Sequence, residues 1–311
     1  MSNNKGIHHI SIISGDAQTN AYFYVKMLGL RMVLKTVNQD DPSSYHLFYA
    51  NGEASPGSSI TFFPWPGTVK GIPGTGQNSA ISFGVPSGSK AFWNERFRSL
   101  DIPHKEPAEH YGNEKIEFED PDGLTLNLVF DDEMNSQPRW SGSNVPEEHS
   151  IRGFWSATLT LVETESTAEI LTDVLGFAAM DLDGNMQRYQ SNSNIGRYMI
   201  LEETGEYKPT KSGRGIVHHI AFRAKDEEEL LSMREKIQQM GLQPTEIIDR
   251  HVFKSVYYQT PGGVLFEMAT DGPGYKSVID DENKMGKELF LPPWLESKRD
   301  QIENRLPKIT V

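Results

Sequence analysis

The chain has 311 residues, of which 37% are hydrophobic and 23% charged, so its composition is that of a globular protein with room for two domains. Its formal charge of −13 argues against a surface that binds nucleic acid. No apolar run approaches the roughly 20 residues of a membrane span, and the N-terminal MSNNKG lacks a signal-peptide core, so no membrane contact and a cytoplasmic location are expected. There is no cysteine, so any metal ligands must be histidine, aspartate or glutamate.

The first half of the chain contains two units with the same order of elements. The first unit begins with the strand-like GIHHISII at Gly6, continues as an amphipathic helix and turns at Gly29. The second unit begins near SAISFGV (79–85), continues as another amphipathic helix and ends in a turn and strand, DPDGLTLNLV (120–129).

The second half repeats this order after a polar, turn-rich stretch at 131–150, which we interpret as a linker. The third unit begins with GFWSATLTL at Gly153 and turns at Gly176, the same spacing as in the first unit. The fourth begins with GIVHHIAF (215–222) and ends in TPGGVLFEMA (260–269), which is similar to the end of the second. Four such units are typical of a repeat architecture.

The pattern predicts an α+β fold with two domains, at 1–140 and 150–270, each made of two βαβββ modules. Residues 271–311 contain LPPWLESKRD and are expected to form a C-terminal tail that packs on the body, with Trp294 as an anchor before a short polar helix.

Three positions of the repeat retain side chains that bind metals well. His9 lies on the first strand of unit one, His219 on the first strand of unit four and Glu267 on its last strand. The equivalent positions of the other copies carry Ser156, Ala80 and Asn127. Two imidazoles and one carboxylate on one face of a metal leave adjacent positions open, as in non-haem Fe(II) oxygenases. We therefore predict one such site.

Each of the two histidine ligands is the second member of an HH pair. Because alternate side chains of a strand point to opposite faces, only one histidine of each pair is expected to face the metal. We prefer the second histidine of each pair. Ser11 follows His9 by two residues and Ala221 follows His219 by two residues, and these small side chains could line a crowded interior.

A tyrosine is expected beside the carboxylate ligand. The TPGG turn folds its strand back, so positions 256 and 257 lie roughly opposite 266 and 267. The phenol of Tyr257 could donate a hydrogen bond to a bound oxygen atom. Tyrosine is also a common strand residue, so a purely structural role remains open.

The chain resembles the vicinal oxygen chelate superfamily of glyoxalases and extradiol dioxygenases over nearly its full length. The resemblance is greatest to ring-cleaving dioxygenases of bacilli that act on hydroquinones, and it lies in GIHHISI, YHLFYANGEASPGSSITFFPWP (45–66), GIVHHIAF, TPGGVLFE and LPPWLE. It implies the vicinal oxygen chelate fold and Fe(II) held by His9, His219 and Glu267.

The resemblance also marks further residues of the site. It implies pocket positions at Arg250, Tyr257 and Ser11, where relatives tend to have threonine, and at the first histidines of the pairs, His8 and His218. Those two histidines, and His251, are candidates to accept the phenol proton or to return one, because imidazole titrates near neutral pH. We assign Tyr257, His8 and His218 to catalysis and Arg250, Ser11 and His251 to substrate binding.

These observations predict an Fe(II)-dependent dioxygenase that inserts O₂ into a hydroquinone- or catechol-type ring. Its expected partners are a small aromatic substrate and O₂, with no nucleic acid and no membrane; assembly into a homo-oligomer stays open. One alternative is a glyoxalase-like isomerase or lyase, which usually has two carboxylate ligands and Zn or Ni. The other is a non-catalytic binding protein of the antibiotic-resistance type.

Overall fold

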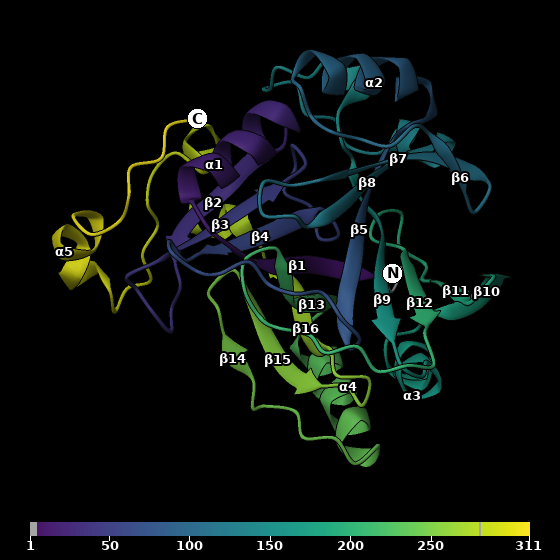
Figure 1. The fold of residues 1–311 in the computed structure, drawn as a ribbon. Coiled ribbons are helices and arrows are strands. Elements are labelled where there is room, and N and C mark those ends of the chain that lie inside the picture. Colours follow the sequence, from purple (N-terminus) through teal and green to yellow (C-terminus); the bar gives the residue numbers. More distant parts are fainter. Residues whose placement is uncertain (1–4, 280) are drawn as a thin grey trace.

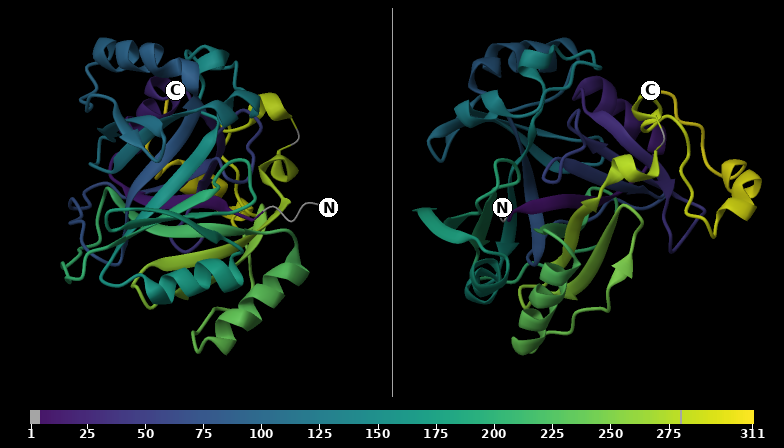
Figure 2. Two further views of the ribbon diagram at one scale, coloured as in Figure 1. Left: turned by 90° about the vertical axis from the view of Figure 1, so that its right-hand side faces the viewer. Right: turned by 180° about the vertical axis from the view of Figure 1, so that it is seen from behind.

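The computed structural model describes residues 5–279 and 281–311. Its strands form two curled eight-stranded sheets with few helices, and the predicted α+β fold of βαβββ modules is confirmed. Helices α1 and α2 lie at one end of the molecule, and α3 and α4 lie at the other (Figures 1 and 2).

The first two modules have the order of elements that the sequence predicts. Module 1 comprises β1 (Ile7–Ser14), α1 (Ala17–Ala21) with a π-helical continuation (Tyr22–Met27), β2 (Arg31–Val37), β3 (Tyr45–Ala50) and β4 (Ser59–Pro64). Module 2 comprises β5 (Gln77–Pro86), α2 (Lys90–Ser99), β6 (Ala108–His110), β7 (Asn113–Glu119) and β8 (Thr125–Asp131).

The second pair of modules repeats this order. Module 3 comprises β9 (Gly153–Leu161), α3 (Glu165–Glu169) with a π-helical continuation (Ile170–Val174), β10 (Ala178–Asp183), β11 (Met186–Gln190) and β12 (Tyr198–Glu203). Module 4 comprises β13 (Ile216–Ala224), α4 (Glu227–Gln239), β14 (Ile248–Asp249), β15 (Phe253–Gln259) and β16 (Leu265–Pro273).

Each sheet combines one module from each half of the chain. The first sheet has the order β14-β15-β16-β13-β1-β4-β3-β2 and joins modules 4 and 1; the second has the order β10-β11-β12-β9-β5-β8-β7-β6 and joins modules 3 and 2. The domain boundaries at 1–140 and 150–270 stay a prediction, since strand pairing does not show which segments fold on their own.

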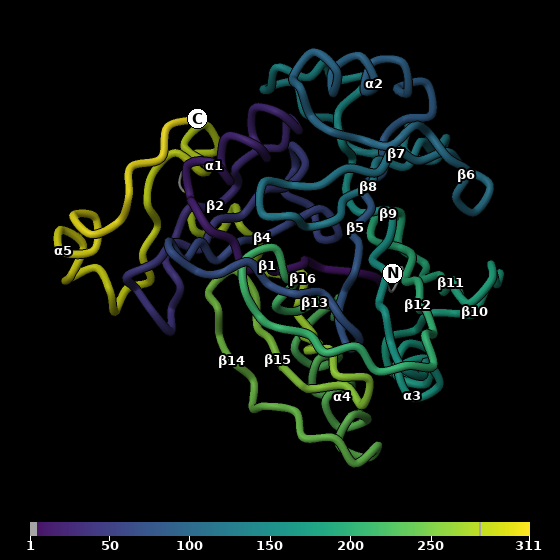
Figure 3. Tube along the Cα trace, in the orientation of Figure 1, coloured from purple at the N-terminus to yellow at the C-terminus, as the bar shows by residue number. Residues whose placement is uncertain are grey.

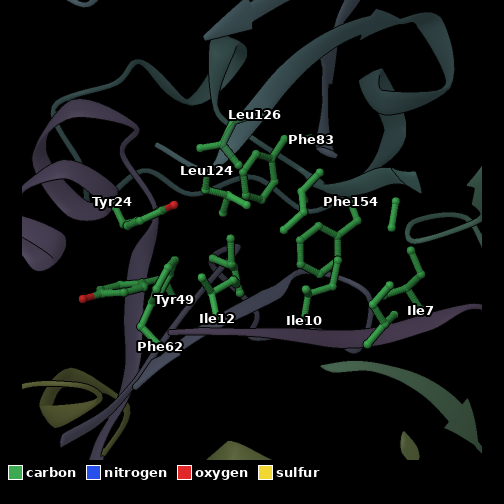
Figure 4. Close-up of a cluster of buried hydrophobic side chains, with 14 of the residues drawn as sticks. Ile7, Ile10, Ile12, Tyr24, Tyr49, Phe62, Phe83, Leu124, Leu126 and Phe154 are labelled. Carbon is green, nitrogen blue, oxygen red and sulfur yellow. The ribbon is translucent and has the colours of Figure 1, made fainter. Parts of the chain in front are cut away.

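The main hydrophobic core fills the space between the sheets. Ile10 and Ile12 of β1 point toward Phe83 and Phe154 of the other sheet (Figure 4). All four side chains are fully buried. Because side chains alternate along a strand, His9 and Ser11 of β1 point to the opposite face, where the candidate site lies.

The C-terminal tail runs along the outside of the first sheet and ends near α1 (Figure 3). Leu289 bridges to Lys35, so the tail extends the sheet beyond β2. The short helix α5 (Arg299–Glu303) follows. Trp294, the expected anchor, is 54% exposed, because the flanking Leu291 and Leu295 occupy the buried positions.

Across the described ranges, no helix is both long and apolar enough to cross a membrane.

Candidate metal centre

Three neighbouring strands bring His9, His219 and Glu267 together. Glu267 Oε2 lies 3.1 Å from His9 Nε2 and 2.9 Å from His219 Nε2, and the two Nε2 atoms are 3.3 Å apart. The side chains belong to β1, β13 and β16, which are adjacent in the first sheet. Within the part of the chain that the structure describes, this is the group of three or more His, Cys, Asp or Glu side chains that could hold a metal.

The strand register makes room for the two imidazoles. His9 pairs with Ala221, and His219 pairs with Ser11. The small residue that follows each histidine by two positions is therefore the cross-strand neighbour of the other histidine. Since opposite side chains lie only about 5 Å apart, a large residue at either place would collide with a ring. The spacing noted in the sequence thus has a packing reason.

Both HH pairs lie at β-bulges, which the sequence analysis did not foresee. The β1–β13 register shifts between Ile7 and His9, and again between Ser11 and Ile12, opposite His218. The extra residues are therefore His8 and His218. A bulge interrupts the alternation of side chains, so the first histidine of each pair can lie beside the second. The group that could hold a metal includes His9 and His219.

The first histidine of each pair contacts the second. His8 Nδ1 lies 2.9 Å from His9 Nδ1, and His218 Nδ1 lies 2.8 Å from His219 Nδ1. A metal bound at Nε2 requires the proton on Nδ1, and that N–H then donates to the neighbouring imidazole. Such partners fix the tautomer and the orientation of a histidine ligand.

The electrostatics of the three side chains suit a cation. All three are buried, and burial lowers the pKa of His219, so that its imidazole is neutral. Burial alone would raise the pKa of Glu267, but His9 and His219 outweigh it and hold that pKa well below its usual value. Glu267 Oε1 has no hydrogen-bond donor among the described residues. A buried, ionised carboxylate without a full set of partners is costly unless a cation binds it.

The distances between the ligand atoms also fit a metal. Two ligands at right angles, each about 2.1 Å from a metal, lie about 3.0 Å apart, whereas tetrahedral ligands lie about 3.4 Å apart. The observed 2.9, 3.1 and 3.3 Å are closer on average to the first value. Two neutral imidazoles and one carboxylate therefore fit a metal that accepts nitrogen and oxygen ligands on one face.

A cavity of about 60 Å³ opens onto His9 and His219. Its walls are largely apolar and include Leu34, Phe48, Phe63, Val252, Phe253 and Phe290. Arg250 and Tyr257 also line it, with the guanidinium carbon 5.6 Å from the centre of the tyrosine ring. Tyr257 pairs with Glu267 across β15 and β16, as the hairpin argument predicts.

Two other residues assigned to substrate binding do not line this cavity. Ser11 is fully buried, and its Oγ lies 2.7 Å from Thr61 Oγ1. His251 has a left-handed backbone conformation (φ 69°) and lies against the tail, with its ring centre 4.9 Å from that of Trp294. The sequence analysis missed the apolar walls and several polar residues of the cavity. Two of these polar residues are Thr36 and His46, which belong to β2 and β3 and have no counterpart in the ligand pattern.

The second sheet has the same register without the ligands. In this sheet Ser82 pairs with Ser156 on one side and with Asn127 on the other. In the first sheet Ala221 pairs in the same way with His9 and with Glu267. The guanidinium of Arg188 packs there against three aromatic rings, those of Tyr111, Trp155 and Tyr198, at 4.6 to 5.7 Å. The equivalent place is thus occupied by side chains that do not bind metals.

Two curled sheets of paired βαβββ modules define a protein of the vicinal oxygen chelate type, and the buried His-His-Glu group on one sheet could hold a metal. The family model described as the Glyoxalase/Bleomycin resistance protein/Dioxygenase superfamily matches residues 6–128 and 156–268. The chain belongs to this superfamily.

Relatives of known name match almost the whole chain. MhqO of Bacillus subtilis, named as a candidate ring-cleaving dioxygenase, is 39% identical over 301 residues, which cover 97% of this chain and 95% of the relative. The chlorohydroquinone/hydroquinone 1,2-dioxygenase of Sphingobium indicum is 33% identical and covers 96% and 94%. These relatives identify the chain as an enzyme of the ring-cleaving dioxygenase class.

Solved structures agree on the fold. The crystal structure of a Bacillus subtilis protein described as a candidate dioxygenase has a TM-score of 0.94 at 38% identity and covers 100% of this chain and 99% of its own. Glyoxalase I from Zea mays has a TM-score of 0.64 at 13% identity, covering 91% and 97%. The second likeness concerns the fold alone.

Proposed function

We propose that the protein is an Fe(II)-dependent dioxygenase that cleaves the ring of a hydroquinone-type aromatic diol. The observation that carries the proposal is the buried His9, His219 and Glu267 group at one end of a cavity with aromatic and aliphatic walls. The name of the Sphingobium relative supports a hydroquinone as the substrate class. When bound, Fe(II) supplies the redox chemistry by which an aromatic ring can react with O₂.

His9, His219 and Glu267 would hold the metal, and the cavity walls would hold the ring. Phe48, Phe63 and Phe253 offer flat apolar surfaces and exclude water from the reacting carbon atoms. Enclosing the aromatic substrate in an apolar cavity also strengthens every polar contact that the substrate makes.

Tyr257 is proposed to donate a hydrogen bond to a substrate oxygen. Burial and the nearby Glu267 raise the pKa of Tyr257, so its phenol stays protonated at neutral pH and acts as a donor. The guanidinium of Arg250 beside it adds a positive charge that favours an ionised substrate hydroxyl.

His8 and His218 are proposed to carry out proton transfer as well as to orient the ligands. His8 is buried, and burial lowers its pKa well below the usual value, so it is neutral and would pass a proton on rather than hold it. His218 reaches the surface of the protein and could exchange a proton with solvent. The role of His251 as a substrate-binding residue stays a prediction, because the residue lies against the tail rather than in the cavity.

The test is O₂ uptake, with product analysis, by the Fe(II)-loaded protein across a panel of hydroquinones and catechols. Ring-opened product from a hydroquinone supports the proposal, and the absence of O₂ uptake with every diol contradicts it. The glyoxalase-like alternative predicts activity with Zn or Ni and no O₂ requirement. A binding protein would retain a ligand without turning it over.

A further inference from the structure

Two polar side chains of the cavity have no part in holding a metal. Thr36 of β2 and His46 of β3 are cross-strand neighbours, and both line the cavity that opens onto His9 and His219. His46 does not belong to the group whose ligand atoms all lie within 4.8 Å of one another. It therefore faces the same space as the ligands from too far away to join them.

Thr36 carries a buried hydroxyl without a partner. The residue is 5% exposed, and Oγ1 has no hydrogen bond to any described residue. A buried unsatisfied hydroxyl destabilises the folded protein, and most such groups in native proteins are paired. Because the residue Thr36 lines the cavity, a ligand bound there could satisfy this hydroxyl.

A hydrogen bond and two aromatic contacts fix the position of the His46 ring. Its Nε2 lies 2.9 Å from Thr61 Oγ1, which in turn lies 2.7 Å from Ser11 Oγ. Phe48 and Phe63 contact its ring, with centres 4.0 and 4.1 Å away. Thr61 and Ser11 are thus positioning residues, and the second ring nitrogen, Nδ1, makes no hydrogen bond with the described residues. Burial also lowers the pKa of His46, so the ring is neutral.

The strand order separates this pair from the metal ligands along the sheet. β4 separates β3 from β1, and β2 lies one strand further out. Along a flat sheet these separations would be about 10 and 14 Å. Curling of the sheet brings Thr36, His46 and His9 around one cavity. An aromatic ring held at its first oxygen by the metal would extend into this cavity, whose lining includes Thr36 and His46.

We infer that Thr36 Oγ1 and His46 Nδ1 bind the second hydroxyl of the substrate, the one directed away from the metal. The protein therefore selects para-diols, whose second hydroxyl lies on the far edge of the ring. Catechol places both oxygens at the metal end and leaves this pair unused. The inference rests on the proposed function, because that function fixes the first oxygen at the metal.

The inference is tested by anaerobic binding of hydroquinone and of phenol to the Fe(II)-loaded protein. The two probes differ only in the far hydroxyl. The wild-type protein should bind hydroquinone about tenfold more tightly than phenol, as expected for a well-placed buried hydrogen bond. Thr36→Val and His46→Phe should each reduce this preference to about twofold, because hydroquinone can present either of its two hydroxyls to the metal, while phenol binding changes little. His104→Gln, in a histidine of the other sheet, should keep the preference.

Stability gives a second readout for the same variants. Thr36→Val removes an unsatisfied hydroxyl, so the melting temperature of the metal-free protein should rise even as the preference for hydroquinone is lost. Thr61→Val releases His46 Nε2 and should weaken hydroquinone binding without affecting phenol binding. An unchanged preference in both Thr36→Val and His46→Phe, or a wild-type protein that binds phenol as tightly as hydroquinone, overturns the inference.

O₂ uptake on the same samples separates this inference from the proposed function. Ring cleavage with an unchanged preference in both variants supports the function and rejects the role of Thr36 and His46. A preference that is lost in the variants, in a wild-type protein that consumes no O₂, supports the binding pair and rejects the dioxygenase reaction.

Discussion

Glu267 is the charged residue on which the candidate metal centre depends. It is fully buried, and it is the carboxylate of the three-ligand group in the described structure. Its contacts are with His9 and His219, both of which bind a metal best when neutral. The negative charge of the site therefore comes from this one side chain.

Glu267→Gln should abolish turnover and weaken metal binding by at least about tenfold, because a neutral amide is a poor ligand. The fold should be retained, since the amide has the same shape and no longer buries an uncompensated charge. Metal content and the melting temperature of the metal-free protein should be measured on one preparation. Wild-type activity in this variant would remove Glu267 from the ligand set.

Tyr257→Phe should lower turnover about 10- to 1,000-fold and leave metal content unchanged, because it removes one oxygen that acts mainly in the transition state. A structural tyrosine would behave differently. Loss of its hydrogen bond would cost about 1 kcal/mol of folding free energy and leave the kinetics nearly intact. Rate and melting temperature measured together decide between the two, and a lower melting temperature with normal ring cleavage would return Tyr257 to a packing role.

The pairing of β1 with β13 matters as much as the ligands that these strands carry. Ala221 lies directly opposite His9 and is fully buried. Ala221→Val adds two methyl groups in the space next to the imidazole. We expect a loss of about 1–3 kcal/mol of folding free energy and at least a tenfold loss of metal affinity, because His9 must shift. A metal titration with a thermal melt measures both.

The second sheet provides a matched control for this variant. Ser82 occupies the position equivalent to Ala221, is 1% exposed and pairs with Ser156. Ser82→Val should reduce stability to a similar extent without changing metal affinity. Equal losses of metal affinity in the two variants would show that general destabilisation, and not the register at His9, causes the effect.

The sequence predicts the helices and strands better than it predicts which strands pair with one another. The repeat of Gly6-to-Gly29 spacing gives the modules, and the TPGG turn gives the pairing of Tyr257 with Glu267. The two bulges could not be predicted, because an HH pair in a strand looks like ordinary alternation until its partner strand is known. Thr36 and His46 could not be predicted either, because they reach the site only through the curl of the sheet, which the sequence does not show.

The described part of the chain contains two equivalent sheets and one set of candidate metal ligands. Ser156, Ala80 and Asn127 occupy the second set of positions, and Arg188 packs among aromatic rings nearby. None of these three side chains is a strong metal ligand. We therefore expect one metal ion per chain at saturation, with one affinity, in a titration followed by metal analysis. Two equivalent metal ions per chain would contradict the loss of the second site.

The pairing of the first module with the last also affects how the enzyme is made. Glu267 lies 258 positions after His9, so at about 5–20 residues per second it leaves the ribosome roughly 13–50 s later. During that interval modules 2 and 3 can complete their own sheet, whereas β1 waits with an unpaired edge for β13. A nascent or truncated chain that ends before Leu265 lacks the carboxylate of the candidate metal centre. The candidate metal centre is thus completed only after β16 has been synthesised.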